Sequence, residues 1–300
     1  MTAYLDHAAT TPMLPAALEA LTGQSTRVGN ASSLHTSGRA ARAVVEESRE
    51  RIASVLGARP SEVVFTSGGT EADNLAVLGA AAAGLAAGRA RVAASTVEHP
   101  AITNAVRTLG ERALWLGVDA DGVVTADALA TLDASVSVAS VLWVNNETGA
   151  IQPVPAVVDA ARRAGALAHS DGVQALGHVP VSFPASGLDA LSLSAHKVGG
   201  PVGIGALVVA PVPPDPSGQD RTLVLFEAET RASRASVSQA LTDAGLVARS
   251  LLLARAEEAT LALAEIDGFL PAEDPRLAAL PWARRTILGA YAAPIAGDAA

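Results

Sequence analysis

Short runs of apolar, often β-branched residues alternate with helical stretches between residues 62 and 210, and this alternation constrains the fold most strongly. The runs that predict strands span residues 62–66, 91–95, 138–144, 166–169, 190–194 and 205–210. Helices are predicted at 37–58 before the first strand, and at 69–88, 98–110 and 154–165 between strands. Strands that alternate with helices favour an α/β fold with a mostly parallel sheet flanked by helices on both faces.

The sequence changes character after residue 210. Residues 210–222 are rich in proline, glycine and aspartate and predict a loop or linker. Residues 238–269 are rich in alanine, leucine, glutamate and arginine and predict a helix, whereas residues 271–300 show no clear period. We therefore expect a large domain over residues 1–250, including the N-terminal segment, and a reduced or altered C-terminal domain over residues 251–300.

Composition excludes several classes of function. The net charge of -9 and the absence of any Lys/Arg run argue against nucleic acid or an anionic membrane as a partner. The sequence contains no cysteine, which excludes disulfides, thiolate metal sites and a cysteine nucleophile within this chain. The N-terminus carries Asp6 and His7 where a signal peptide has a basic start and an apolar run, so we expect a cytoplasmic protein.

Lys197 is the only lysine, because the other 20 of the 21 Lys and Arg residues are arginines. Arginine keeps its proton near neutral pH, whereas a partly desolvated lysine can become a neutral amine that acts as a nucleophile or forms a Schiff base. An ordinary solvated lysine is the default interpretation of any lysine. Because Lys197 is the only lysine of the chain, we favour a chemical role for it.

Other polar residues directly follow the predicted strands, where ligands bind in open parallel α/β sheets. The residues that we expect to gather at this edge are Gly69, Thr70, His99, Asn146, Asp171, Gln174, Ser194, His196 and Lys197. Gly69 and Thr70 open a predicted helix after a strand, which is a natural cradle for a phosphate group.

Each of these features has a simpler interpretation when it stands alone. The glycine turn before Thr70 can be an ordinary helix start, and Asp171 and His99 can be helix caps. A metal site built from His169, Asp171 and His196 fits by residue type, but no ligand pair has helical spacing, and we expect no metal. Together, a lysine, an acid, a histidine and a phosphate cradle are the groups that pyridoxal phosphate chemistry needs.

The sequence also resembles a known family. The cysteine desulfurases, in the class V aminotransferase group of fold-type I pyridoxal phosphate enzymes, carry similar motifs in the same order over about residues 3–209. The motifs are YLDHAATTP, GNASSLHTSGRAAR, EVVFTSGGTEADNLAV, VEHPAI, VNNETGAIQP, HSDGVQALGHVPV and LSLSAHKVGGPVGIGAL. The resemblance implies the fold-type I large domain and pyridoxal 5′-phosphate as the cofactor.

The resemblance also implies a role for each site residue. Lys197 would hold the cofactor as an internal aldimine and move the substrate α-proton, and His99 would stack on the ring and pass protons. Asp171 would pair with the pyridine nitrogen and Gln174 with O3′. Asn146 would lie near O3′ and the substrate carboxylate. The phosphate would be held by Gly69, Thr70, Ser194 and His196.

The resemblance further implies an amino-acid substrate, a homodimer and a sulfur-acceptor protein as a partner. The resemblance fails beyond about residue 209. Family members carry a GGxQExxxRSGT-like segment whose Thr reaches the partner subunit's phosphate. This chain reads LFEAETRASRASVSQ in that region, where Ser233 and Ser236 are both candidate substitutes. The late segment RRTILGAY makes Arg285 a candidate for the substrate carboxylate. The persulfide-forming cysteine of the family is absent from this chain.

Three hypotheses follow from these observations. The first is a desulfurase-like enzyme that acts on cysteine or an analogue through a Lys197 aldimine. The second is a pyridoxal phosphate lyase or aminotransferase that needs no protein thiol. The third is a truncated, non-catalytic paralogue that acts as a binding subunit.

Overall fold

The computed structural model describes residues 3–211, 221–228, 233–246, 248–255, 260–267, 275–278, 280 and 284–291. Contacts within the chain group Met1–Ala210 as one compact unit and Pro211–Ala300 as a second. The division therefore falls before the expected boundary at residue 250, because a new sheet begins at residue 221. Most of the predicted linker, residues 212–220, lies outside the described residues.

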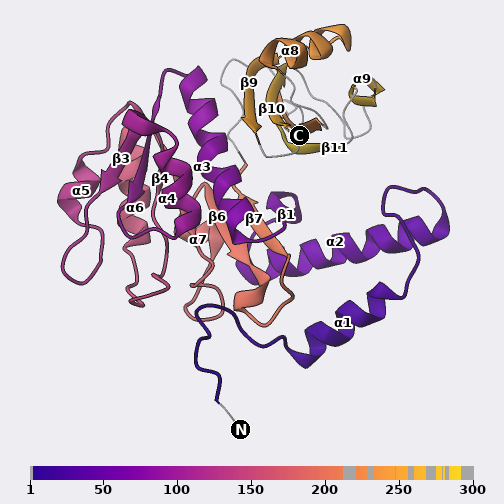
Figure 1. The fold of residues 1–300 in the computed structure, drawn as a ribbon, viewed down its shortest axis with the longest axis horizontal. Helices are drawn as coiled ribbons and strands as arrows, with labels where there is room; N and C mark the ends of the chain where they lie inside the picture. The colour runs from indigo at the N-terminus through magenta and orange to yellow at the C-terminus, as the bar shows by residue number, and fades with distance from the viewer. Residues whose placement is uncertain are drawn as a thin grey trace, which may run out of the picture. The chain divides into compact units, whose positions relative to one another are not determined.

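The first unit is built on a seven-stranded sheet with the order β1-β7-β6-β5-β4-β2-β3 (Figure 1). Its strands are β1 (Val63–Thr66), β2 (Arg91–Ser95), β3 (Ala113–Leu116), β4 (Val136–Ser140), β5 (Leu167–Asp171), β6 (Ala190–Ser194) and β7 (Gly205–Val209). Strands β2 to β6 pair in parallel, whereas β7 is antiparallel to its neighbours β1 and β6. The mostly parallel sheet that the alternating pattern predicts is confirmed.

Helices cover both faces of this sheet. They are α2 (Thr36–Leu56), α3 (Gly69–Ala86), α4 (Pro100–Arg107), α5 (Ala126–Ala130), α6 (Val154–Ala164) and α7 (Phe183–Ser186), whereas α1 (Pro15–Ser25) buries none of its residues. Helices α2, α5, α6 and α7 contribute to one apolar cluster that contains Ala93 of β2. Helices α3 and α4 contribute to another cluster that contains Val92 and Ala94. Successive residues of β2 thus pack on opposite faces, as the alternation of strand side chains requires.

Local signals explain where several helices begin and end. The His35 ring accepts a hydrogen bond from the Gly38 N–H at the start of α2, and Gly57 ends this helix with φ of 69°. Such a left-handed φ is costly for residues other than glycine. Helix α4 begins with a proline at its first position, where the missing N–H costs nothing. No helix in the described part of the chain is long and apolar enough to cross a bilayer.

Strand β3 is absent from the sequence prediction. Its residues, ALWL, form a run of four without a β-branched member, and this run is too short to separate from a loop by pattern. It is an edge strand that pairs only with β2 in the sheet order. Tertiary pairing rather than local propensity therefore makes it a strand.

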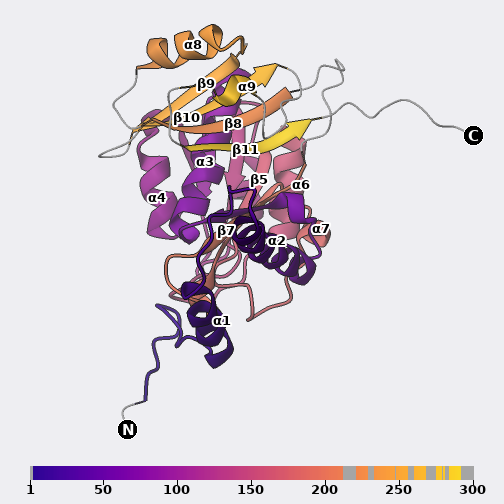
Figure 2. The same cartoon turned by 90° about the vertical axis from the view of Figure 1, so that its right-hand side faces the viewer.

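The second unit contains a four-stranded antiparallel sheet with the order β11-β8-β10-β9 (Figure 2). Its elements are β8 (Arg221–Ala228), α8 (Arg234–Asp243), β9 (Ala248–Arg255), β10 (Thr260–Asp267), α9 (Pro275–Ala278) and β11 (Arg284–Tyr291). This βαββαβ sequence of elements is the ferredoxin-like arrangement.

The helix predicted over residues 238–269 is wrong, since this range contains the end of α8 followed by β9 and β10. Alanine, leucine and glutamate have high helix propensity, and their abundance favoured that prediction. Residues 260–264, however, read TLALA, an alternation with the period of a strand. Pairing of β10 with strands on both sides decides the outcome.

Helix α3 packs so closely on the sheet that Gly84 has no room for a side chain. A Cβ built on Gly84 would overlap the Cβ of Ser137 in β4 and lie 2.8 Å from the Arg89 carbonyl oxygen. We expect Gly84→Ala to lower the free energy of unfolding by about 1–3 kcal/mol, the usual cost of overpacking. Chemical denaturation followed by circular dichroism measures this change.

Gly23→Ala in α1 is the matched control, because nothing lies within 4 Å of the added Cβ. Alanine has the higher helix propensity, so this control should stabilise the chain slightly or leave it unchanged. Equal unfolding midpoints for Gly84→Ala and the wild type would contradict the close packing of α3.

Candidate active site

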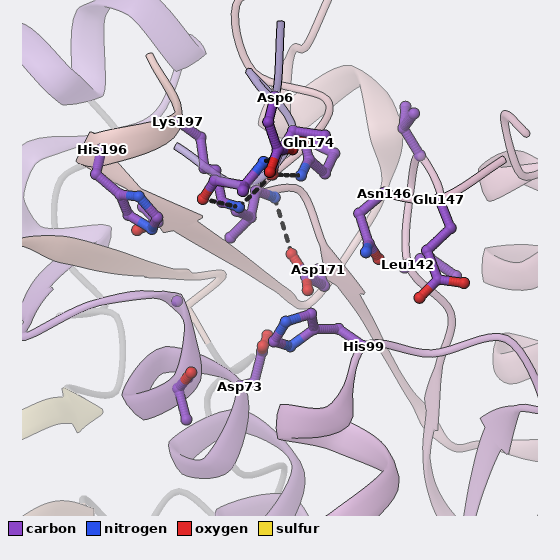
Figure 3. A pocket seen from close by; sticks show the side chains of 17 residues that line it. Asp6, Asp73, His99, Leu142, Asn146, Glu147, Asp171, Gln174, His196 and Lys197 are labelled. Atoms are coloured by element: carbon purple, nitrogen blue, oxygen red, sulfur yellow. Dashed lines mark hydrogen bonds between the residues drawn. The ribbon is translucent and has the colours of Figure 1, made fainter. Parts of the chain in front are cut away.

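A cavity of about 540 Å³ opens in the first unit beside the ends of several strands (Figure 3). Every cofactor residue predicted from the sequence lines it, namely Gly69, Thr70, His99, Asn146, Asp171, Gln174, Ser194, His196 and Lys197. Its volume lies in the range of small-molecule pockets. The structure therefore brings all of the predicted cofactor residues together, although they come from segments far apart in the sequence.

One wall of the cavity is the N-terminus of α3. The helix is preceded by Gly68, whose position has no side-chain cap. A Cβ on Gly69 would lie 2.7 Å from Cγ2 of Val173, so glycine at the first position of α3 allows the close approach of Val173. The first turn of a helix presents N–H groups without intrahelical partners and a positive dipole end, which together bind anions.

Ser194 lies at the end of β6 and faces the same wall. Its buried Oγ has no hydrogen-bond partner within the described residues. A buried hydroxyl without a partner is costly in a finished fold. An anion at the N-terminus of α3 would supply an acceptor, so these residues fit a phosphate group.

Lys197 lies in a short 3-10 turn, η3 (Ala195–Lys197), that follows β6. Its Nζ donates hydrogen bonds to the carbonyl oxygens of Ala8 and, at 2.8 Å, Ala9. Desolvation lowers the pKa of Lys197 from its ordinary value, while the charges of Asp171 and Asp6 act against this shift. A lowered pKa makes the neutral, nucleophilic amine more accessible.

Asp171 is the buried last residue of β5. Its Oδ1 accepts a hydrogen bond of 2.8 Å from the Val173 N–H. Burial raises the pKa of Asp171, and the hydrogen bond from Val173 together with the nearby His99 and Lys197 opposes this rise. A buried carboxylate that faces a cavity favours a cationic partner there, and a protonated pyridine nitrogen fits this requirement.

His99 caps α4 and lines the cavity at the same time. Its Nδ1 accepts a hydrogen bond of 3.2 Å from the Ala101 N–H, which leaves the proton of the neutral ring on Nε2. Asn146 also lines the cavity, and its neighbour Asn145 donates from its side chain to the Val97 carbonyl oxygen at 3.0 Å. The cap interpretation and the site interpretation of His99 are therefore compatible.

The N-terminal segment closes one side of the cavity. The Thr11 N–H donates to the His196 carbonyl oxygen at 2.9 Å, and the Leu14 N–H donates to the Gly199 carbonyl oxygen at 2.9 Å. Gln174 Nε2 donates to the Ala8 carbonyl oxygen at 2.8 Å. Sequence reasoning noticed the YLDHAATTP motif here but gave no role to its backbone, because carbonyl groups leave no sequence signal.

Two buried acids near the cavity were also missed. Glu98 is buried, and its Oε1 accepts hydrogen bonds from Ser95 Oγ at 2.6 Å and the Leu142 N–H at 2.8 Å. Burial raises the pKa of Glu98 to about 8. Asp73 is buried in α3 and lines the cavity. Its place one helical turn after Gly69 was the available signal, since residues i and i+4 share a helix face.

The alternative metal set does not converge. His169 lies buried in β5, where Nδ1 and Ser140 Oγ are 2.9 Å apart and Nε2 and Ser192 Oγ are also 2.9 Å apart. Both ring nitrogens are therefore engaged, and His169 does not line the cavity with Asp171 and His196. Burial lowers the pKa of His169 to about 3, so its ring is neutral.

The candidates downstream of residue 210 lie in the second unit, whereas the residues that line the cavity all belong to the first. Ser233 caps α8, since its Oγ accepts a hydrogen bond of 3.1 Å from the Ser236 N–H. Ser236 Oγ donates to the Ser233 carbonyl oxygen at 2.8 Å. Arg285 lies in β11. The site roles suggested for these three residues remain predictions.

The mostly parallel sheet with helices on both faces, and the cavity at its strand ends, have the architecture of the fold-type I pyridoxal phosphate proteins. Residues 3–216 match the family described as Aminotransferase class-V. The chain belongs to this family, whose cysteine desulfurase members depend on pyridoxal 5′-phosphate.

Individual relatives carry more specific names. The IscS-like cysteine desulfurase of Mycobacterium tuberculosis is 51% identical over 216 residues, which are 69% of this chain and 55% of that protein. A solved NifS-like protein has a TM-score of 0.67 at 33% identity. The match covers 71% of this chain and 61% of the NifS-like chain. The structure described as SspA in complex with cysteine has a TM-score of 0.65 at 31% identity. The match covers 70% of this chain and 64% of that chain.

The chain spans about half the length of the curated relatives that it matches. The family match ends at residue 216, so β8 to β11 lie beyond it. The resemblance thus extends over the unit that contains the cavity, and the ferredoxin-like unit is outside the family match.

The raised pKa of Glu98 predicts a pH dependence of stability. Because its folded pKa of about 8 exceeds the usual value of 4.5, its contribution is fully present below pH 4.5 and is lost as pH rises toward 8. Relative to Glu98→Gln, we expect the wild type to lose up to about 4 kcal/mol of unfolding free energy between pH 5 and 8.

Urea denaturation of both proteins at pH 5, 6.5 and 8 measures this difference. The amide of the variant can still accept from Ser95 and Leu142, so the comparison isolates ionisation of Glu98. A pH-independent difference between the two proteins would show that Glu98 is not a neutral buried acid.

Proposed function

We propose that this chain binds pyridoxal 5′-phosphate in the cavity and acts on cysteine or a related amino acid, with Lys197 as the point of covalent attachment. The observation that carries the proposal is the position of the chain's sole lysine, in one cavity with Asp171 and the N-terminus of α3. Membership of the class V aminotransferase family supports the cofactor. The cysteine desulfurase names of its relatives support the substrate class.

Bound pyridoxal phosphate supplies an electron sink that stabilises negative charge at the substrate α-carbon. In this proposal the Asp171 carboxylate holds the ring nitrogen in its protonated form, and the His99 ring lies against the cofactor ring. Gln174 donates to the ring hydroxyl. The free Lys197 amine, which burial makes easier to deprotonate, takes up and returns the α-proton. Gly69, Thr70, Ser194 and His196 hold the phosphate.

Any sulfur released from the substrate leaves this chain by a route that uses no protein thiol, since the sequence contains no cysteine. A thiolate is the nucleophile that accepts sulfane sulfur, and serine or aspartate does not replace it. The acceptor in this proposal is therefore an added small-molecule thiol or a thiol of a sulfur-acceptor protein.

The absence of cysteine also favours a second candidate function within the same site. A pyridoxal phosphate lyase or aminotransferase needs Lys197, Asp171 and the phosphate cradle but no protein thiol. A non-catalytic binding subunit is the third candidate, and the ferredoxin-like unit beyond the family match is the observation that favours it.

We further propose that two copies of the chain form a homodimer through the N-terminal segment. Helix α1 buries none of its residues, and Leu14, Leu18 and Leu21 are exposed along it. Val28 and Leu34 are 90% and 84% exposed. A group of exposed large apolar side chains of this kind favours a protein interface. The cytoplasmic location expected from the sequence remains a prediction.

Reductive trapping tests cofactor attachment with unusual clarity, because the chain offers one lysine. After incubation with pyridoxal phosphate, the wild type should show the visible absorbance of bound cofactor. Borohydride reduction should then fix one cofactor to the peptide that contains Lys197. Lys197→Arg keeps the charge but cannot be attached, so its spectrum should lack the band.

Peptide mapping separates attachment at Lys197 from attachment at the N-terminal amine, the other amine of the chain. Absence of the visible band in folded wild-type protein would reject pyridoxal phosphate binding. A labelled peptide other than that of Lys197 would reject the assignment of the lysine.

The lack of a thiol predicts that the chain never carries a persulfide. After incubation with pyridoxal phosphate and cysteine, the intact mass should show no added sulfur atom. Sulfide or a small-molecule persulfide should form faster when an external thiol is present, because that thiol is the acceptor. A stable gain of one sulfur atom on the chain would contradict this route.

A further inference from the structure

The structure places a second buried carboxyl group, that of Asp73, close to Asp171, the acid assigned to the ring nitrogen. Asp73 is 1% exposed and Asp171 is 7% exposed, and both line the cavity. A carboxylate oxygen from each and one ring nitrogen of His99 all lie within 4.8 Å of one another (Figure 3). Two carboxyl groups this close in a buried setting do not both ionise, because the like charges repel in a low dielectric.

The surroundings decide which of the two keeps the proton. Asp171 accepts from the Val173 N–H and feels the positive influence of Lys197 and His99, all of which stabilise its charge. Asp73 lacks comparable support. Its Oδ1 has no hydrogen-bond partner within the described residues.

The nearest basic group to Asp73 does not supply a charge. His169 Nε2 is 3.8 Å from Asp73 Oδ1, but burial keeps this ring neutral. Glu98 is a further buried acid whose charge would disfavour ionisation of Asp73. Burial is the largest effect and, with the charge of Asp171, raises the pKa of Asp73 well above its usual range, while a hydrogen bond with Ser192 acts against it.

We infer that Asp73 is a positioning residue that stays protonated and donates a hydrogen bond to Asp171, holding that carboxylate ionised and aimed at the ring nitrogen. This inference rests on the proposed function for the direction in which Asp171 points. The placement of the proton is a property of the cofactor-free chain. Asp73 does not touch the reacting atoms in this account and acts through Asp171.

The inference explains why a helix that opens a phosphate cradle carries an acid one turn later. Gly69 and Asp73 lie four residues apart on α3, so the same helix face offers an anion site first and a proton donor next. The rigid helix thereby sets the phosphate position and the Asp171 orientation together.

Infrared spectroscopy of the cofactor-free protein at neutral pH tests the proton placement. Asp73→Asn should lose one protonated-carboxyl signal relative to the wild type. The matched control Asp171→Asn should keep that signal and lose carboxylate absorption instead. Retention of the full signal in Asp73→Asn would overturn the inference.

Cofactor titration followed by visible absorbance tests the positioning role. Asp73→Leu removes the donor, and we expect it to bind pyridoxal phosphate about tenfold more weakly, as for loss of a hydrogen bond to a charged group. Asp73→Asn still donates through its amide and should weaken binding by no more than about threefold. Equal affinities for Asp73→Leu and the wild type would overturn the inference.

The two measurements separate the inference from the proposed function. If wild-type protein binds no pyridoxal phosphate, the proposed function fails, and the infrared comparison still decides where the proton lies. If Asp73→Leu does not fold, the infrared comparison of the near-isosteric Asp73→Asn decides the inference by the outcomes given above.

Discussion

The close packing of α3 on the central sheet is the constraint on which the site depends. Near its C-terminal end the helix passes so near Ser137 that only glycine fits at position 84. At its first position Gly69 allows contact with Val173, which follows Asp171 in the chain. Between these points Ala72 and Ala76 pack beside Leu207. Because α3 packs closely on its neighbours at both glycines, it has little freedom to tilt. Its N-terminus and Asp73 therefore keep fixed places beside the strand ends.

The buried ionisable groups around the cavity are mostly acids. Asp73, Asp171 and Glu98 are buried, and the one buried basic group described beside them, His169, is neutral. Burying ionised carboxylates without cations is costly, and such groups retain protons instead. In the cofactor-free site these acids therefore favour the protonated form. Asp171 has the best stabilised carboxylate of the three, and it would stabilise a cationic ring beside it.

Much of the first unit could be predicted from its sequence because local pattern and tertiary structure agree there. The strands at 91–95 and 190–194 were predicted with the observed bounds, and Lys197 stood out by composition alone. Asp73 could not be recognised in the same way. An acid near the start of a helix usually complements the helix dipole from a solvated position, and its burial here results from the sheet beneath it.

In the second unit, composition favours helices where the structure has strands. Its strand β10 reads TLALAEID, in which residues with high helix propensity are arranged with the period of a strand. Composition and period disagree, and pairing with β8 and β9 resolves the disagreement. The family resemblance carried no information here, since the match ends at residue 216.

The N-terminal segment holds the side chain of Lys197 through hydrogen bonds between residues far apart in the sequence. Residues Ala8 and Ala9 accept from Lys197 Nζ, while Thr11 bonds to the turn that holds His196. These contacts connect the start of the chain to residues more than 180 positions later. Closing so long a loop costs conformational entropy, and the folded sheet between the two segments offsets this cost by bringing them together. The orientation of Lys197 therefore depends on the tertiary fold and on carbonyl groups that no side-chain motif reveals.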